Sequence, residues 1–514
     1  MPTSRLYPSL KRLKLLAVIL LLTEIRLFSQ VPSALSLREI SAADYGAVPD
    51  MVTGKDGVLD GSTFTSATAH FVAQDKGKLI FVAGGGLSGR DFQTTISRIV
   101  QPASVLLSTA ASTAVKDAPY SYGTDDLHSM QRAFDAAAGG TVYIPGNFQR
   151  CYALSDSLVI ASSGTRVHGD GSSSCLVNVA INSKNGDGGT VIAIHDRNGV
   201  PLSDIEVDHL QLNNVGSTYV LDHAGVALLE ITGPITSSVA NIKFHDLTLS
   251  THNRECLTNG ATLDSFWVQN NLFKFCAEGG LYLAGKPSNV VVRGNRFLGA
   301  LGSTAGSAIR VKNSTDIEVS GNFIAMNGYG NAGIQFVDYL SARPKVFDNV
   351  ITAFDQPGSS GVYFGFTLDG EIRHNTIIGA VGTAIYLSFT RIGPGRGGAT
   401  STLVDQNTLQ GCHSWGIAAT GVNGRYASDV VITGNRLVDC VNGIQIDKTE
   451  GRVEVTDNII FAGDHLVGRA SLSIFAATPA AAHISGNTVI NYSTSAFAAG
   501  VSGVDDREPS TDYP

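Results

Sequence analysis

Charged residues are scarce in this 514-residue chain, at 16 %, and its six cysteines form no C-x-x-C pair. Scarce charge does not indicate disorder here, because 43 % of the residues are hydrophobic. The cysteines form no cluster with histidines either, so the sequence predicts no zinc site. A chain of this length is too long for one compact core of ordinary shape, whereas a solenoid grows in one dimension and escapes that limit.

The first 36 residues have the pattern of an export signal. A basic segment from Arg5 to Lys14 precedes the apolar run Leu15–Leu22, and small residues at 34–36 suit a signal peptidase. The run is too short to span a bilayer, although an unprocessed N-terminal anchor is the alternative. We therefore expect a secreted, periplasmic or cell-surface protein with no membrane contact once the signal is removed.

Removal of residues 1–36 leaves 31 basic and 43 acidic residues, a net charge of −12. That charge argues against nucleic acid as a partner. It does not argue against an acidic polysaccharide, because a basic cleft can lie on an acidic protein. The oligomeric state has no signature in the sequence.

A short phrase with a central asparagine recurs every 23–32 residues, which is the signature of a repeat fold. Each copy reads apolar, two residues, Asn, apolar, and the nine asparagines are Asn271, Asn295, Asn322, Asn349, Asn375, Asn407, Asn435, Asn458 and Asn487. FHDLTL and VDHLQL extend the series backward, with Asp246 and His209 in place of the Asn. We expect the asparagines to stack at a tight corner that needs a left-handed residue.

A second phrase follows each Asn and reads small, apolar, any, apolar, as in GLYL, AIRV, GIQF and GVYF. Each coil thus has three short strands, with no helical pattern between them. Alternation of period two places the apolar side chains inside. The sequence predicts an all-β, right-handed parallel β-helix of about 10–12 coils.

Residues 124–138 read as one amphipathic helix. Thr124 is the expected N-cap, and Leu127, Met130, Phe134 and Ala137 share one face. Such a helix would cover the open N-terminal end of the solenoid, whose unpaired strand edge invites aggregation.

Three segments resemble the opening of the pectate lyase-like β-helix superfamily, which includes polysaccharide lyases and polygalacturonase-like and tail-spike-like proteins. They are DYGAVPD (44–50), TDDLHSMQRAFDAAAGGTVYIPGNF (124–148) and GTRVHGDG (164–171). The resemblance is specific for the fold and implies a carbohydrate-active protein. The roughly 70 residues between the first two segments look like a small inserted β module of the kind found in phage-tail proteins.

These features divide the chain into four expected parts. They are a signal peptide (1–36), an N-terminal segment with the inserted module (37–123), the β-helix with its cap helix (124–500) and a disordered tail (501–514).

In relatives of this fold the substrate lies along the outer face of one strand series. The outward positions of the second phrase are Thr258, Tyr282, Arg310, Gln335, Tyr363, Tyr386, Ala418 and Gln445. Aromatic faces stack on sugar rings, and Arg and Lys pair with carboxylates. The alternative is an ordinary set of cross-strand pairs that stabilises the sheet.

We expect a uronate polysaccharide to be the partner and β-elimination to be the reaction. Arg310 would bind the uronate carboxylate, Lys312 would act as base or neutraliser, Tyr363 as acid, and Asp338 would pair with Lys312. The expected substrate-binding residues are Tyr282, Gln335, Tyr386 and Glu278. A non-catalytic binding or tail-spike-like scaffold protein is the second hypothesis.

A glycoside hydrolase is a further alternative. AIRVK (308–312) is similar to the R-I-K motif of polygalacturonases, but the other motifs of that family are missing. Hydrolysis needs two carboxylates, and only the loop acids Glu278, Asp338 and Asp355 are near the expected face.

No cofactor is expected. Calcium-dependent lyases use clustered Asp residues, which the strand series lacks, so calcium stays an alternative only. His223, His245, His252 and His413 share no spacing and are expected to be loop or corner residues rather than metal ligands.

Cys412 and Cys440 each follow their repeat Asn by five residues, so they occupy equivalent places on adjacent coils. We expect a disulfide between them, with stacked free thiols as the alternative. Cys276 has the same offset from Asn271. The state of Cys151 and Cys175 is left open.

Overall fold

The structure is a computed structural model that describes residues 39–179, 190–195, 200–214, 229–232, 238–250, 255–300, 306–389, 400–421, 427–447, 449–462, 472–475 and 482–490. The expected signal peptide, the expected tail, His223 and His252 lie outside these residues. Within the described part, no helix is both long and apolar enough to cross a membrane.

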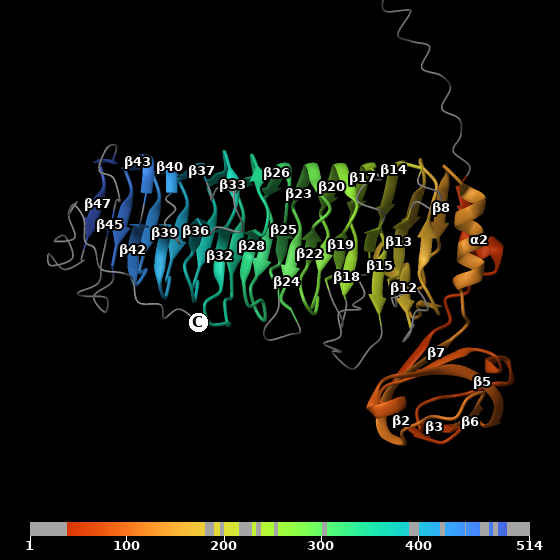
Figure 1. Ribbon diagram of the computed structural model, residues 1–514. Coiled ribbons are helices and arrows are strands. Elements are labelled where there is room, and N and C mark those ends of the chain that lie inside the picture. Colours follow the sequence, from red (N-terminus) through yellow and green to blue (C-terminus); the bar gives the residue numbers. More distant parts are fainter. Residues whose placement is uncertain are drawn as a thin grey trace, which may run out of the picture. The chain divides into compact units, whose positions relative to one another are not determined.

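Three parallel sheets stack strand upon strand along one axis (Figure 1). The first sheet precedes the asparagine corner, the second follows it, and the third contains the phrase with the outward tyrosines. They hold 16, 13 and 12 strands respectively. In the described residues no α-helix lies between successive repeat asparagines, so the predicted parallel β-solenoid is confirmed.

The strands of the first sheet are β1 (Glu39–Ser41), β8 (Thr141–Ile144), β11 (Arg166–Gly169), β14 (Leu202–Asp208), β17 (Ser238–His245), β20 (Thr262–Gln269), β23 (Pro287–Arg293), β26 (Thr315–Ser320), β29 (Ser341–Ala342), β30 (Lys345–Phe347), β33 (Thr367–Leu368), β34 (Glu371–Arg373), β37 (Thr400–Asp405), β40 (Ala427–Thr433), β43 (Thr449–Thr456) and β46 (Ala482–Ser485).

The strands of the second sheet are β9 (Tyr152–Leu154), β12 (Cys175–Asn178), β15 (Gln211–Asn214), β18 (Thr248–Ser250), β21 (Leu272–Phe273), β24 (Arg296–Leu298), β27 (Phe323–Ala325), β31 (Val350–Thr352), β35 (Thr376–Ile378), β38 (Thr408–Gln410), β41 (Arg436–Val438), β44 (Ile459–Phe461) and β47 (Thr488–Ile490).

The strands of the third sheet are β10 (Leu158–Ile160), β13 (Ile192–His195), β16 (Leu229–Thr232), β19 (Leu257–Asn259), β22 (Leu281–Leu283), β25 (Ile309–Val311), β28 (Ala332–Phe336), β32 (Ser360–Phe364), β36 (Ile385–Phe389), β39 (Trp415–Gly421), β42 (Asn442–Asp447) and β45 (Leu472–Phe475).

The predicted inserted module is a small closed antiparallel barrel, in the strand order β2-β3-β6-β5-β4-β7. Closure leaves it without free strand edges. Its strands are β2 (Val52–Asp60), β3 (Thr63–Thr65), β4 (Leu79–Val82), β5 (Phe92–Gln101), β6 (Ser104–Leu107) and β7 (Val115–Gly123). Short 3-10 helices lie at η1 (Ala42–Tyr45), η2 (Ala73–Asp75), η3 (Leu87–Gly89) and η4 (Gly171–Ser173).

Helix α2 (Leu127–Ala137) occupies the segment predicted to be helical and contacts β8 and β10. Met130, Phe134 and Ala137 are buried, as the expected face requires. The predicted N-cap is wrong: Asp126 holds that position, and Thr124 instead donates two hydrogen bonds to Asp50, each 2.8 Å long.

The nine repeat asparagines form the predicted column. The first eight, from Asn271 to Asn458, each donate the backbone N–H to the Oδ1 of the asparagine on the next coil over 2.9–3.1 Å. Each side-chain amide also donates to a backbone carbonyl, as Asn349 Nδ2 does to Val319 O over 2.9 Å. The column therefore satisfies buried polar groups at the corner.

The left-handed residue at this corner is the one before each Asn, not the Asn itself. Gly294 and Gly321 hold positive φ angles of 68° and 61°, where a side chain is disfavoured. In the two preceding coils Asp246 and His209 occupy this left-handed position. The prediction that they replace the Asn is thus wrong by one residue. Buried leucines, Leu247 and Leu210, take the place of Asn in those coils.

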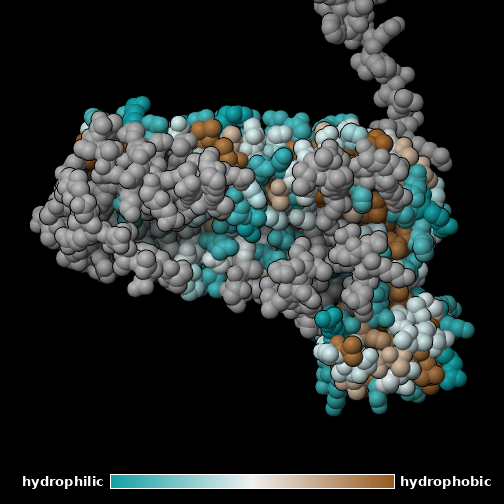
Figure 2. All heavy atoms as spheres, viewed as in Figure 1, coloured by the Kyte–Doolittle hydropathy of each residue, from teal (hydrophilic) through white to brown (hydrophobic). Residues whose placement is uncertain are grey.

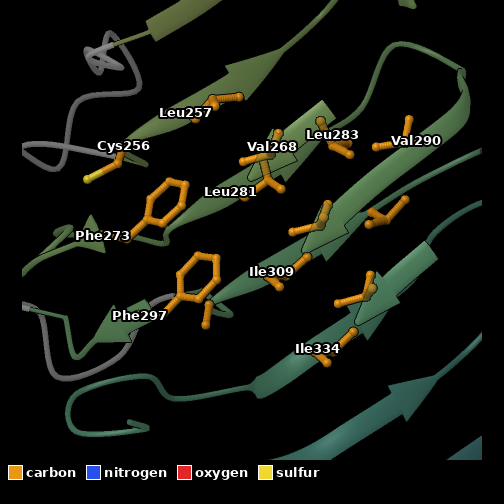
Figure 3. Packing of buried hydrophobic residues seen from close by; sticks show 14 of the residues in the cluster. Cys256, Leu257, Val268, Phe273, Leu281, Leu283, Val290, Phe297, Ile309 and Ile334 are labelled. Atoms are coloured by element: carbon orange, nitrogen blue, oxygen red, sulfur yellow. The ribbon is translucent and has the colours of Figure 1, made fainter. Parts of the chain in front are cut away.

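Columns of equivalent apolar side chains fill the solenoid (Figure 3). Leu281, Ile309 and Ile334 are paired in consecutive strands and are fully buried. The rings of Phe273 and Phe297 stack with centroids 4.4 Å apart. The small residue that opens the third-sheet phrase has a steric reason, because a Cβ on Gly361 would lie 2.7 Å from the Ala384 carbonyl oxygen. Repeated burial of this kind is the main favourable term of the fold.

Three disulfides join Cys151 to Cys175, Cys256 to Cys276 and Cys412 to Cys440. The predicted Cys412–Cys440 bond is confirmed, with the Cα atoms 4.1 Å apart. Cys276, which has the same offset, pairs instead with Cys256.

We expect thiol titration of the unfolded, unreduced protein to find no free thiol, since all six cysteines are bonded. Reduction before titration should then expose all six. Detection of six free thiols without reduction would contradict the three bonds.

Candidate functional site

The outward positions of the third sheet form one continuous row, as the sequence predicted. Backbone pairing joins Thr258, Tyr282, Arg310, Gln335, Tyr363, Tyr386, Ala418 and Gln445 on successive strands. We call this the tyrosine row. The backbone of Glu230 on the preceding strand pairs with Thr258.

Four side chains converge at the centre of the row. Arg310 lies 3.1 Å and Lys312 2.5 Å from the same oxygen, Oδ2, of Asp338. The Arg310 guanidinium carbon lies 5.4 Å, and Lys312 Nζ 5.2 Å, from the ring centroid of Tyr282, within reach of a cation–π interaction. The predicted pairing of Asp338 with Lys312 is confirmed, and Asp338 also binds Arg310.

Arg310 and Lys312 carry two positive charges and Asp338 one negative charge, so these four side chains have a net charge of +1. Burial alone lowers the pKa of Lys312, but hydrogen bonds with Asp338 and Tyr282 outweigh it and hold that pKa above its usual value. Lys312 therefore stays an ammonium at neutral pH and is suited to neutralise an anion rather than to accept a proton. The Arg310 Nε is buried and has no hydrogen-bond partner, so part of its donor capacity is unused by the protein.

The rest of the row combines polar and aromatic contacts. Ser307 donates to the Gln335 side chain over 2.8 Å. The rings of Tyr363 and Tyr386 meet edge to face, with centroids 5.3 Å apart, and the Tyr386 hydroxyl lies 3.0 Å from Thr420 Oγ1. Such pairs also stabilise a sheet, so this part of the row fits either of the two expectations.

Not every expected site residue lies with this group. Glu278 precedes β22, whereas Asp338 follows β28, so they belong to opposite ends of the parallel strands. Asp355 accepts a hydrogen bond over 2.8 Å from the backbone of Gly328, in the turn of the preceding coil, and so is engaged away from this group. Where described residues of the solenoid are visible in Figure 2, hydrophilic and intermediate residues predominate over scattered hydrophobic ones.

A second polar cluster escaped the sequence reading. The ends of β8, β11, β14 and β17 align Tyr143, His168, Asp208 and His245 in one row of the first sheet. His209 follows Asp208 at the left-handed corner. From the sequence, His245 was expected to be a loop or corner residue. Its alignment with His168 is visible only from the pairing of the strands, because these coils lack the repeat Asn that marks equivalent positions elsewhere.

Comparison with known proteins supports the fold. A family described as the right handed beta helix region matches residues 235–392 and 391–489. The sequence matches no curated protein.

Solved structures with the same architecture are distant from this chain. The A-module of mannuronan C-5 epimerase AlgE6 from Azotobacter vinelandii is 14% identical, with a TM-score of 0.45 over 71% of this chain and 95% of that one. The surface adhesin PfbA of Streptococcus pneumoniae is 16% identical, with a TM-score of 0.49 over 70% and 90%. DFA-IIIase from Arthrobacter chlorophenolicus A6 is 13% identical, with a TM-score of 0.49 over 64% and 90%.

These three likenesses do not bear on activity or substrate. The match to the right-handed β-helix family agrees with the three stacked parallel sheets and the asparagine column. The chain is therefore a right-handed parallel β-helix protein, in keeping with its resemblance to the pectate lyase-like superfamily.

Proposed function

We propose that the tyrosine row binds an anionic, uronate-containing polysaccharide. The observation that carries this proposal is the convergence of Arg310 and Lys312 on Asp338 beside the Tyr282 ring. A uronate carboxylate complements two adjacent cations, and the sugar ring complements an aromatic face. Neighbouring strands are about 4.8 Å apart, so an extended chain would meet successive side chains of the row.

The reaction that we propose for this face is β-elimination. Elimination begins with neutralisation of the uronate carboxylate, which acidifies the adjacent C–H bond. Arg310 and Lys312 would supply that neutralisation, since Lys312 is held as an ammonium. Tyr363, two coils beyond Arg310 in the row, would act as the acid. In this assignment Lys312 is the neutraliser. A solvent water would take the C5 proton while Tyr363 gives its phenolic proton to the departing glycosidic oxygen, so that one proton is lost and one gained as the C4–O bond breaks and the C4=C5 double bond forms. Gln335 and Tyr386 would orient the polymer.

A screen across pectate, alginate and rhamnogalacturonan tests both the proposed binding and the proposed β-elimination. Ultraviolet absorbance of an unsaturated uronate product reports elimination, and affinity electrophoresis in the same polymers reports binding. Binding without product would favour the non-catalytic scaffold hypothesis. New reducing ends without the absorbance would favour a hydrolase acting through loop acids such as Asp338.

We expect Arg310→Ala and Lys312→Ala each to weaken polymer binding by about tenfold or more, the equivalent of one charged contact. Arg310→Lys should recover only part of the loss, because it restores charge but not the planar fork. Stability should fall by about 1 kcal/mol or less, because the ion pairs of Arg310 and Lys312 with Asp338 are still partly exposed to solvent. The measurements are affinity electrophoresis and thermal unfolding.

Arg373→Ala and Lys345→Ala are matched controls, because both residues form ion pairs with Glu371 on the first sheet, away from the row. These controls should bind the polymer as the wild type does. Equal binding by all four Ala variants would show that the row is a structural ladder.

We also propose that the protein is exported, with the signal at 1–36 and the remaining boundaries at 37–123, 124–500 and 501–514. Three disulfides support this, because such bonds persist in oxidising compartments. In this scheme α2 covers the N-terminal end of the solenoid, and the barrel serves as an attachment module.

A further inference from the structure

The histidine cluster on the first sheet is separate from the tyrosine row. Its three most closely spaced members, His168, Asp208 and His209, come from two consecutive coils. His168 lies on β11, and its register partner Asp208 ends β14 on the next coil. His209 follows Asp208 with a φ of 52°, a left-handed conformation that is uncommon for a residue with a side chain.

Three ligand-type atoms meet at one point in this cluster. His209 Nδ1 lies 2.7 Å from Asp208 Oδ1, and His168 Nδ1 contacts the same oxygen. Arg166 occupies the other carboxylate oxygen, Oδ2, over 2.7 Å. The Asp208 side chain is fully buried, whereas His168 is 31% and His209 44% exposed. Arg166 thus holds the buried carboxylate of Asp208, whereas the imidazoles of His168 and His209 are both accessible to solvent.

Three side chains hold the Asp208 carboxylate in place, because Arg166, His168 and His209 all contact its oxygens. A further histidine and carboxylate lie beside the three atoms. The rings of His209 and His245 are 6.1 Å apart, and Glu206 lies 3.4 Å from His245 Nε2.

We propose that His168, Asp208 and His209 bind a divalent transition-metal ion of the zinc class. Their ligand atoms lie within 4.8 Å of one another, so small side-chain rotations bring them to one ion. Imidazole nitrogens favour zinc, nickel or copper, whereas calcium prefers an all-oxygen site. The ion would cross-link two consecutive coils where the asparagine column is replaced by leucines.

The test uses tag-free, full-length protein dialysed against a chelator, with Zn²⁺ and Co²⁺ alone as probes. We expect one ion to bind per chain, a visible absorption band with Co²⁺, and a rise in the unfolding temperature with Zn²⁺. His168→Gln and His209→Gln should each weaken Zn²⁺ binding by roughly 100-fold or more and remove the thermal shift, since loss of an outer-shell partner alone costs about 10–100-fold.

His374→Gln is the matched control. His374 is also a corner residue, with a φ of 53° and 44% exposure of its side chain, but it lies several coils away near Asp348. It should bind Zn²⁺ as the wild type does. No bound ion in the wild type, or equal loss in His374→Gln and His209→Gln, would overturn the proposal. The ion-free unfolding temperature of each variant separates a folding defect from loss of the site.

Discussion

Replacement of Asn349 by Ala should lower the free energy of unfolding by about 2–4 kcal/mol, because each buried polar group left without a partner costs about 1–3 kcal/mol. Asn349 Oδ1 accepts two bonds from Asn322, and Asn349 Nδ2 donates to Val319 O and to Asn375 Oδ1. Ala can replace none of them, and the site is fully buried. Urea-induced unfolding followed by circular dichroism measures the loss.

Gln410→Ala is the control for this prediction, since Gln410 is an exposed residue of the second sheet. Its effect should stay within about 0.5 kcal/mol, as for most surface substitutions. Equal stability of Asn349→Ala and Gln410→Ala would contradict a structural role for the asparagine column. Local loss of one coil is also expected, because solenoids are stabilised by nearest-neighbour contacts.

Stability should fall as pH rises through the neutral range because of Asp126 at the start of α2. Burial, together with the nearby Asp50 charge, raises the pKa of Asp126 to about 8. One carboxylate oxygen accepts the Val48 N–H over 2.8 Å, and the other has no partner. The folded protein therefore retains a proton that the unfolded chain releases above a pKa of about 3.9.

Because folding takes up a proton at Asp126, stability decreases as pH rises. The contribution of Asp126 is fully present below about pH 4 and is lost progressively as pH rises toward about 8. Relative to Asp126→Asn, which cannot titrate, the wild type should lose about 3 kcal/mol between about pH 5 and about pH 7. Urea unfolding of both proteins at the two pH values measures this difference.

Asp135→Asn provides the comparison, because Asp135 is exposed on the same helix. Its stability should follow the wild-type pH dependence. If Asp126→Asn also follows the wild type, then Asp126 is ionised in the folded protein and its burial has been compensated by another group.

The features that were predictable from the sequence are those that repeat locally. Period-two alternation and the spacing of the asparagines were sufficient to place Tyr282, Arg310 and Gln335 in consecutive register positions. The same offset arithmetic located the Cys412–Cys440 bond. These inferences needed only the repeat length, which is visible wherever the Asn marker is present.

The histidine cluster was not predictable in this way. The register partners His168 and Asp208 are 40 residues apart, and the register partners Asp208 and His245 are 37 apart, both longer than the 23–32 residues of the marked coils. Leu210 and Leu247 replace the marker there, so register had to come from the pairing of whole strands. The N-cap error at Thr124 has a similar origin, since Asp50, distant in sequence, draws Thr124 into a separate contact.

The most direct test of uronate recognition compares one polymer in two chemical forms. A polyuronate bound by the wild-type protein is reduced at its carboxyl groups to the neutral polysaccharide of the same linkage, and affinity electrophoresis is repeated in both. We expect strong retardation in the native polymer and loss of most of that retardation in the reduced polymer, because Arg310 and Lys312 then lack an anionic partner. Equal retardation in both forms would contradict the claim that this face recognises uronate carboxylates.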